Sequence, residues 1–343
     1  MSLRIVIRAD AGPSIGGGHA YRTAVLGERL QMQGAEVVYA TRSESLTAVP
    51  SLESHGFRLL LLDSVAPFEE PIYIKEALGE LDLFVLDHYH RGIEFERAVL
   101  PFSARLLVLD DLPTRQHACD FLLDQTLGRQ AAEYRSLIPS DCVVMTGPRY
   151  ALLRPQFSRA RRAGRCRKRK SISRLLVMVG AGDISGVLNW TMDALSCLEV
   201  ALDIDIVTAS EAYSELDGKA LGKSRISIHR HVTDMASLIA DADLAIGAAG
   251  SASWERCCLG LPALLFILAE NQIDVCQALH ESGAAVNLGH FPGVSREHFL
   301  GEVRKLLNSE RLLSKLSEKA ALLCDGRGAE RLLELVFDEN QSL

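Results

Sequence analysis

The strongest constraint on the fold of this sequence is a pattern that occurs near the N-terminus and again after the middle of the chain. A short apolar run is followed by a glycine-rich turn and then by a helix-length stretch. The first run is LRIVIR from Leu3, with a helical pattern from about Ala20 to Gln33, and the second run extends from Arg174 to Val179. A buried strand followed by a tight turn and a helix opens a β-α unit. The sequence therefore predicts an α/β fold.

Further strand-like runs repeat this pattern in both halves of the chain. Most of them are separated by helical or loop segments, which favours two doubly wound parallel sheets. The residues after about 295 have the composition of helices, which we expect to pack on the second domain and in part to return to the first. The additional runs cover residues 36–41, 57–62, 83–87, 105–110, 203–207, 226–230, 244–247 and 263–267.

The length of the chain and one basic segment set the expected domain boundaries. A chain of 343 residues fits two domains, because a domain usually has roughly 100–200 residues. Residues 159–170, RARRAGRCRKRK, carry eight basic residues in twelve, and such a run is typical of a solvated linker. We predict an N-terminal Rossmann-like domain over residues 1–158, a basic linker over 159–172 and a C-terminal Rossmann-like domain over 173–343.

Composition and charge disfavour several classes of function. The formal charge of −7 provides no overall attraction for nucleic acid or for a membrane surface, so any bound phosphate must be held by local geometry. No apolar run approaches the roughly 18 residues that a membrane helix needs, and we expect a cytoplasmic protein without stable membrane insertion. The eight cysteines form no CxxC pair, which favours reduced thiols in the core. The sequence does not indicate an oligomeric state.

The first candidate site is the turn between the first strand and the first helix. Gly16, Gly17 and Gly18 precede His19, and Arg22 follows one turn later. Ligands of open α/β sheets bind at the carboxyl ends of strands, where glycines let a ligand approach the backbone and a helix N-terminus favours an anion. His19 is suited to take a proton from water there, although a helix residue that only packs would also fit the position. The turn lacks the G-x-G-x-x-G spacing, which disfavours a dinucleotide cofactor.

A second candidate is the segment DHYHR, which ends the fourth strand at Asp87. Its best candidate for one polar contact to a ligand is the hydroxyl of Tyr89. A metal site is disfavoured, because no carboxylate-rich partner motif accompanies His88 and His90. The next strand ends at the acidic pair 110–111, for which a helix cap and a site role are equally good interpretations.

The second half of the chain carries three more candidates at strand ends. After the strand at 244–247, small residues and hydroxyls at a helix start form a nest suited to phosphate, and an acidic residue one turn later could accept hydrogen bonds from ribose. A glycine turn after the strand at 174–179 could let a diphosphate approach the backbone. Each pattern also fits a simple cap or a tight turn. The residues concerned are Gly180 and Asp183 in the glycine turn, Gly250, Ser251, Ser253 and Glu255 in the nest, and Asn271 and Gln272 after the strand at 263–267.

Taken together, these segments resemble the UDP-sugar hydrolases of pseudaminic acid biosynthesis, a branch of the superfamily that includes the MurG-type glycosyltransferases. The likeness runs through most of the chain, and the set and order of its segments are specific. It rests on Arg8-x-Asp10, Ile-Gly-x-Gly-His19-x-x-Arg22, Asp87-His-Tyr89, Asp110-Asp111, Gly147-Pro-x-Tyr150-x-Leu-x-Arg154, Phe157, Gly250-Ser251-x-Ser-Trp-Glu255 and Glu-Asn271-Gln272.

The resemblance implies a GT-B fold, in which two Rossmann-like domains face each other across a cleft. It also implies hydrolysis of UDP-2,4-diacetamido-2,4,6-trideoxy-β-L-altropyranose to UDP and the free sugar, with inversion, C–O cleavage and no required metal or cofactor. Two alternatives stay open: a MurG-like glycosyltransferase that uses an acceptor other than water, and a non-catalytic binder of nucleotide sugars. By resemblance, His19 is the base that deprotonates water, Tyr89 and Asn271 lie near the sugar, and Ser251, Ser253 and Glu255 hold the diphosphate and ribose.

Overall fold

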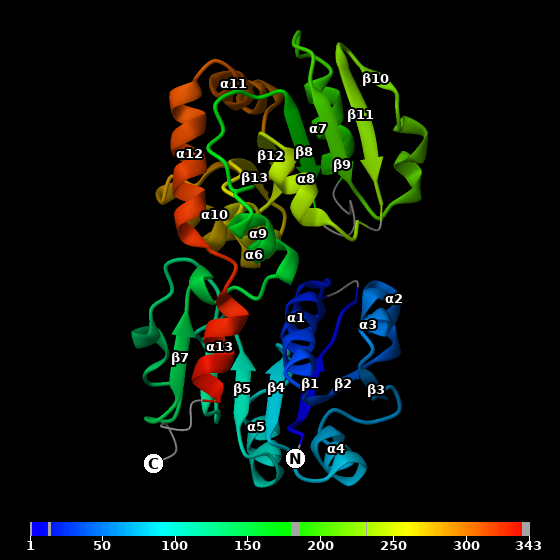
Figure 1. The fold of residues 1–343 in the computed structure, drawn as a ribbon, viewed down its shortest axis with the longest axis vertical. Helices are drawn as coiled ribbons and strands as arrows, with labels where there is room; N and C mark the ends of the chain where they lie inside the picture. The colour runs from blue at the N-terminus through cyan, green and yellow to red at the C-terminus, as the bar shows by residue number, and fades with distance from the viewer. Residues whose placement is uncertain (1, 13–14, 180–185, 231, 338–343) are drawn as a thin grey trace. The chain divides into compact units, whose positions relative to one another are not determined.

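The computed structural model describes residues 2–12, 15–179, 186–230 and 232–337, which form two compact units (Figure 1). The N-terminal unit comprises residues up to Leu153 together with those from Arg327 onward, and the C-terminal unit comprises Arg154–Gly326. Each unit contains one seven-stranded sheet. Within the described ranges, no helix combines the length and the apolar character that a membrane span requires.

The sheet of the N-terminal unit is parallel throughout and has the strand order β3-β2-β1-β4-β5-β6-β7. The order runs outward from the first strand in both directions, as in a doubly wound fold, so the loops after β1 and β4 leave the same edge side by side. The elements of this unit are β1 (Arg4–Ala9), α1 (Gly18–Met32), β2 (Glu36–Thr41), α2 (Ser43–Ala48), α3 (Ser51–Ser54), β3 (Arg58–Leu61), α4 (Glu70–Leu78), β4 (Leu83–Asp87), α5 (Ile93–Val99), β5 (Leu106–Leu109), β6 (Phe121–Asp124), β7 (Val143–Thr146) and α13 (Gly328–Val336).

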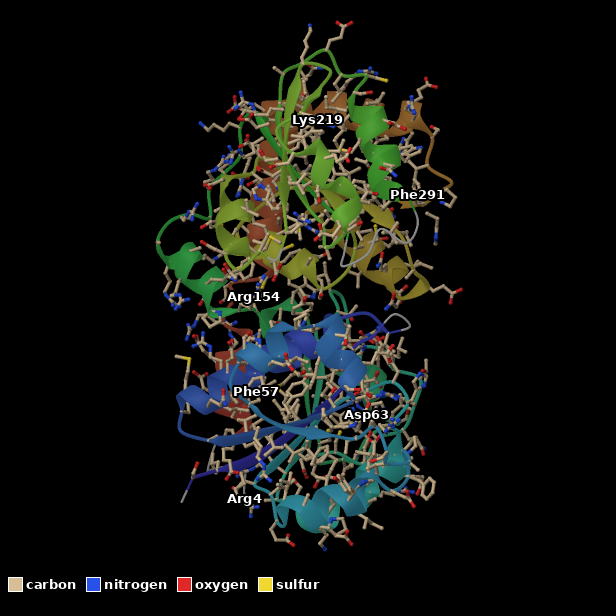
Figure 2. All side chains as sticks on the ribbon, turned by 90° about the vertical axis from the view of Figure 1, so that its right-hand side faces the viewer. Arg4, Phe57, Asp63, Arg154, Lys219 and Phe291 are labelled. Atoms are coloured by element: carbon tan, nitrogen blue, oxygen red, sulfur yellow. The ribbon has the colours of Figure 1, made fainter. Side chains whose placement is uncertain are left out.

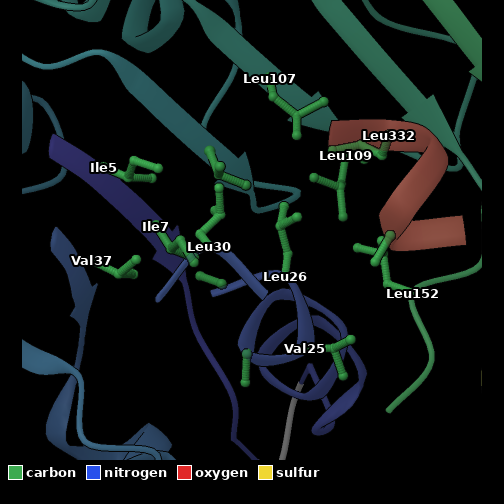
Figure 3. Close-up of a cluster of buried hydrophobic side chains, with 14 of the residues drawn as sticks. Ile5, Ile7, Val25, Leu26, Leu30, Val37, Leu107, Leu109, Leu152 and Leu332 are labelled. Carbon is green, nitrogen blue, oxygen red and sulfur yellow. The ribbon is translucent and has the colours of Figure 1, made fainter. Parts of the chain in front are cut away.

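Alternating apolar residues of the strands divide the core of this unit between the two faces of its sheet. Ile5 and Ile7 of β1 belong to one cluster, whereas Val6 between them belongs to the other. Figure 3 shows the first cluster, which α1 and β1 share with Leu332 of the C-terminal helix α13. The end of the chain therefore completes the core of the N-terminal unit.

The sheet of the C-terminal unit has the strand order β10-β11-β9-β8-β12-β13-β14. It is parallel except at its edge, where the two-residue strand β10 runs antiparallel to β11. The elements of this unit are α6 (Pro155–Arg162), β8 (Arg174–Met178), α7 (Val187–Leu195), β9 (Asp203–Val207), β10 (Ala220–Leu221), β11 (Ser224–His229), α8 (Met235–Asp241), β12 (Leu244–Ala248), α9 (Ala252–Cys258), β13 (Ala263–Ile267), α10 (Ile273–Glu281), β14 (Ala285–His290), α11 (Arg296–Leu307) and α12 (Glu310–Leu323).

The predicted α/β class with two doubly wound sheets is confirmed, but four strands were missed. They are β6, β7, β10 and β14. Three of the four have only two to four residues, which is too short for a periodic pattern of apolar residues to be recognised. They form strands because a neighbouring strand pairs with them. The observed boundary between the units also differs from the expected one, because α6 belongs to the C-terminal unit and α13 to the N-terminal unit.

The basic segment expected to be a solvated linker over 159–172 lies inside the C-terminal unit instead. Arg169 is fully buried, and its guanidinium donates to three carbonyls at the end of α8 and to the carbonyl of Leu259, just after α9. Arg161 donates to carbonyls at the ends of α9 and α12. The last carbonyls of a helix lack partners within the helix and carry partial negative charge. The linker prediction is therefore wrong, because helix ends provide acceptors that let these arginines pack inside the unit.

Candidate active site

Three loops of the N-terminal unit bring polar side chains to the carboxyl edge of its sheet. They follow β1, β4 and β5, which are neighbours in the sheet. His19 lies in the first turn of α1, Tyr89 is the second residue after β4, and Asp111 is the second residue after β5. This edge is where open α/β sheets bind their ligands. The structure thus brings the predicted residues His19, Arg22 and Tyr89 together.

Asp87, the last residue of β4, joins His19 to Arg22 through a buried carboxylate. His19 Nδ1 lies 2.5 Å from Asp87 Oδ1, and Arg22 donates to both carboxylate oxygens at 2.6 Å. Because an ionised carboxylate only accepts hydrogen bonds, the proton of the neutral imidazole is assigned to Nδ1 and the lone pair to Nε2. The side chain of His19 is 10% exposed, and Nε2 has no hydrogen-bond partner among the described residues. The geometry leaves Nε2 available as a base.

The charges around Asp87 keep it ionised. Burial alone would raise the pKa of Asp87, but the charge of Arg22 and the hydrogen bonds from Arg22 and His19 outweigh burial and hold this pKa well below its usual range. A carboxylate in this position orients the imidazole and stabilises the imidazolium that forms when Nε2 takes a proton. The sequence analysis gave Asp87 no role. The signal that could have revealed this role is the position of Asp87 in the sheet. It ends a strand that pairs with β1, and α1 follows β1 in the chain.

Tyr89 and Asp111 form a second pair beside His19. The hydroxyl of Tyr89 donates to Asp111 Oδ1 at 2.8 Å, and the tyrosine ring meets the imidazole of His19 edge-on, with the ring centroids 4.7 Å apart. Burial, with a further contribution from the charge of Asp111, raises the pKa of Tyr89, so the phenol stays protonated at neutral pH. Since its proton is donated to Asp111, the Tyr89 oxygen can serve a ligand as an acceptor.

Two arginines that the sequence analysis did not identify hold these loops in place. Arg115 donates from Nη1 to the carbonyl of Tyr89 at 2.5 Å, and Arg129 donates from Nη2 to the carbonyl of Asp111 at 3.1 Å. Both also pair with a buried aspartate through Nε. Contacts to backbone carbonyls leave no residue pattern in the sequence, so nothing there could have indicated them.

Two other polar residues at this edge have structural roles. Asp110 has a fully buried side chain and accepts hydrogen bonds from two neighbouring side chains. His88 donates from Nε2 to Asp10 at 3.1 Å and accepts at Nδ1 from the backbone N–H of His90, so both of its nitrogens are used. Of the acidic pair 110–111, Asp111 is the member with a partly exposed carboxylate, at 27%. In the part of the chain that the structure describes, no cluster of three His, Cys, Asp or Glu could hold a metal.

The three glycines before His19 shape the start of α1. Gly16 has φ of +71°, which residues with a side chain rarely adopt. A Cβ on Gly17 would lie 2.9 Å from the ring of Tyr21. The helix then begins at Gly18, and no side chain caps its first N–H groups. The glycine run therefore permits the left-handed turn at Gly16 and the close approach of Tyr21 to Gly17, just before the turn that carries His19.

The turn between β12 and α9 carries a second group of predicted residues, in the C-terminal unit. Ser251 is exposed and its hydroxyl does not cap α9, a helix of only seven residues. A Cβ on Gly250 would meet nothing within 4 Å, so the turn is open beside it. Ser253 differs, because it is only 1% exposed and its oxygen accepts a hydrogen bond from Arg256 at 2.8 Å. Ser251 can meet a ligand directly, whereas Ser253 is packed beneath the turn.

Glu255 of α9 forms an ion pair with Arg154, which is labelled in Figure 2. Arg154 Nη2 lies 3.1 Å from Glu255 Oε1, and the glutamate side chain is 18% exposed. Burial raises the pKa of Glu255, and the charge of Arg154 opposes that rise. The partners are 101 residues apart in the sequence, so no local pattern could have paired them.

The remaining predicted residues lie after β13 or outside the described residues. Asn271 is exposed in a 3₁₀ turn that spans Glu270–Gln272. Gln272 accepts a hydrogen bond at Oε1 from the backbone N–H of Leu268 at 3.0 Å and so stabilises that turn. Gly180 and Asp183 lie outside the described residues.

Comparisons with known proteins agree on the fold. No family model matches the chain. This chain is 23% identical to the spore coat polysaccharide biosynthesis protein SpsG of Bacillus subtilis (strain 168), over 352 aligned residues that cover 98% of each chain. It is 27% identical over 209 residues, 61% of this chain and 70% of the relative, to the UDP-2,4-diacetamido-2,4,6-trideoxy-beta-L-altropyranose hydrolase of Campylobacter jejuni. The crystal structure of Acinetobacter baumannii MurG matches with a TM-score of 0.70 at 16% identity, over 98% of this chain and all of MurG. The predicted GT-B fold is confirmed.

The buried histidine beside the site should make stability depend on alkaline pH. His117 lies between Glu96 and Asp110. Burial acts to lower the pKa of His117, but the hydrogen bonds and charges of these carboxylates outweigh it and raise the pKa to about 9. A histidine whose pKa is raised by folding stabilises the folded state. This contribution is fully present below the pKa of the unfolded state, about 6.5, and is lost as the pH rises through the folded pKa of about 9.

We therefore expect the free energy of unfolding to fall between pH 6.5 and 9.5, by on the order of 1–2 kcal/mol more in the native protein than in His117→Gln. Urea denaturation across this range measures the difference. The variant His298→Gln, which changes an exposed histidine, should behave as the native protein does. Parallel curves for the native protein and His117→Gln would contradict the assignment of a cationic His117.

Proposed function

We propose that this protein is a nucleotide-sugar hydrolase, which cleaves UDP-2,4-diacetamido-2,4,6-trideoxy-β-L-altropyranose at its anomeric C–O bond with water as the acceptor. The observation that carries the proposal is the arrangement of His19, whose Nδ1 is bound to the buried Asp87 while Nε2 is left without a partner in the described residues. The relative in Campylobacter jejuni, which carries the name of this hydrolase, supports the choice of substrate.

In this mechanism, Nε2 of His19 accepts a proton from the attacking water. The oxygen of that water forms a bond to the anomeric carbon on the face opposite the leaving group, and the bond from that carbon to the oxygen of the diphosphate breaks. UDP leaves with the electron pair, so the configuration at the anomeric carbon inverts. The charge that develops on the imidazole lies against Asp87, which the pairing with Arg22 keeps ionised.

The leaving group needs little acid assistance, because a nucleoside diphosphate is already a stable anion. We assign the nucleotide to the C-terminal unit, where Gly250 and Ser251 form an open turn and Glu255 has a partly exposed carboxylate. Ser251 can donate to a phosphate oxygen, and Glu255 can accept from ribose hydroxyls. In the N-terminal unit, the acceptor oxygen of Tyr89 is the group that we assign to the sugar.

A glycosyltransferase with an acceptor other than water is the second candidate, which the match to MurG favours. Its chemistry would use the same base on a hydroxyl group of the acceptor. A non-catalytic binder of nucleotide sugars is disfavoured, because it would have no use for an imidazole that a buried carboxylate orients.

Proton NMR of the purified protein with the UDP-sugar and no acceptor separates these functions. We expect the anomeric signal of the substrate to be replaced by that of the free sugar, with the inverted configuration appearing first, together with UDP. Consumption of substrate only after acceptor is added would favour the transferase instead. Saturable binding without turnover would favour the binder.

Replacing the base should remove turnover and spare nucleotide binding. General-base catalysis contributes roughly 10²–10⁴-fold, so we expect His19→Gln to lower kcat by about that factor with an unchanged Kd for UDP. His90→Gln is the matched control, because His90 is an exposed histidine one residue from Tyr89. Near-normal turnover of His19→Gln would remove His19 from its assigned role.

Asp87→Asn should act through the tautomer of His19. An amide at this position can donate to Nδ1, which would move the imidazole proton to Nε2 and abolish the base. We expect kcat to fall to nearly the level of His19→Gln while the Kd for UDP stays within about threefold, and the double variant to be no slower than either single variant. Additive losses in the double variant would show that Asp87 acts independently of His19.

A further inference from the structure

The C-terminal unit buries two arginine side chains that form no ion pair with a carboxylate in the described residues. Arg169 is 0% exposed and Arg256 is 2% exposed. The neighbouring carboxylate of Glu255 pairs with Arg154 and not with Arg256. A cation removed from water is costly unless hydrogen bonds or an opposite charge replace its hydration. The charge of each of these two arginines must therefore be compensated by groups around it.

Arg169 is compensated completely within the unit. Its Nε and both Nη atoms donate to backbone carbonyls, most of them at the ends of α8 and α9. Those carbonyls carry the partial negative charge of helix C-termini. Arg169 is thus a structural residue that needs no further partner.

Arg256 is compensated only in part. Its Nη2 donates to the carbonyl of Ala248 at 2.9 Å and to Ser253 Oγ at 2.8 Å, but its Nη1 is buried without a hydrogen-bond partner in the same described residues. Because Ser253 accepts from Arg256, the hydroxyl proton of Ser253 is free to be donated elsewhere, and no described residue accepts it. Two unused donors therefore lie together in this part of the unit.

The position of Arg256 places these donors beneath the carboxyl edge of the sheet. Ala248 is the last residue of β12 and Ser253 lies in the first turn of α9, so the guanidinium spans the turn between them. Nη1 lies 3.6 Å from the point that a Cβ on Gly247 would occupy, and that same Cβ would lie 2.1 Å from the carbonyl oxygen of Met178 on β8. Gly247 thus lets the carbonyl of Met178 on the neighbouring strand approach closely, and the guanidinium of Arg256 lies in contact beside it.

We propose that Arg256 is a positioning residue for the diphosphate of the nucleotide, whose negative charge completes the compensation of this buried cation. Arg256 fixes the turn from Ala248 to Ser253, and so holds the exposed Ser251 between them in position to meet the anion. Its charge also stabilises the diphosphate as the leaving group, because a charge in a poorly solvated site is weakly screened. The inference rests on the proposed function, and it adds a residue that acts through the turn instead of touching the substrate.

Calorimetric titration of the 343-residue protein with UDP, UMP and uridine tests this inference. We expect Arg256→Met to weaken binding of UDP by about 10- to 100-fold and of UMP by less, and to leave binding of uridine unchanged, since uridine has no phosphate. Arg256→Lys, which keeps the charge, should recover most of the loss. A merely structural role would weaken UDP and uridine equally and would show no rescue by lysine.

Arg169→Met is the matched control for loss of a buried guanidinium. It should lower the urea midpoint as much as Arg256→Met does, or more, while the ratio of the uridine Kd to the UDP Kd stays that of the native protein. If Arg256→Met does not fold, Arg256→Lys and Ser253→Ala carry the test, and Ser253→Ala should weaken UDP selectively. A native protein that binds UDP no better than uridine would overturn the proposed function. A native preference for UDP that Arg256→Met retains would overturn only the role of Arg256.

Discussion

The carboxylate of Asp87 is the constraint on which the N-terminal site depends. It lies at the end of β4 with no exposure, and it receives hydrogen bonds from two residues of the first turns of α1. These contacts fix the rotation of α1 against the sheet and at the same time fix which nitrogen of His19 is free. A reactive histidine near a helix N-terminus would otherwise be held only by backbone that three glycines make permissive. The same hydrogen bonds to Asp87 therefore position the helix and orient the base.

A second buried network supports the loops around this carboxylate. Arg8 of β1 contacts Asp10 and Glu70, and Arg91 after β4 contacts Glu70 as well. Burial would raise the pKa of Glu70, but the two arginines lower it, so this buried carboxylate stays ionised. It ties the ends of β1 and β4 to the start of α4, below the residues that face a ligand. The loops after these strands are thus fixed from beneath by charge as well as by the apolar core.

Sequence reasoning could predict the features that are local in the chain. The strand, glycine turn and helix around His19 are contiguous, so their order alone placed the histidine at the carboxyl edge of a sheet. Contacts between distant segments could not be predicted, because no pattern in the sequence indicates them. Examples are the pairing of Arg154 with Glu255 and the backbone contacts of Arg115. The basic segment was misinterpreted for a related reason. Its charge suggested exposure, whereas the helix ends that accept the hydrogen bonds of Arg169 come from elsewhere in the chain.

The two units treat buried charge differently, and the difference follows the roles proposed for them. In the N-terminal unit, Arg8, Arg22 and Arg91 each face a carboxylate, so the base already lies in a balanced environment before any ligand arrives. In the C-terminal unit, Arg256 keeps an unused donor at the end of β12. A site that must receive and release an anion gains affinity from an excess of positive charge that only the ligand balances. A site that must move a proton gains instead from charges that are paired beforehand, because its groups then need no reorganisation as charge develops in the reaction.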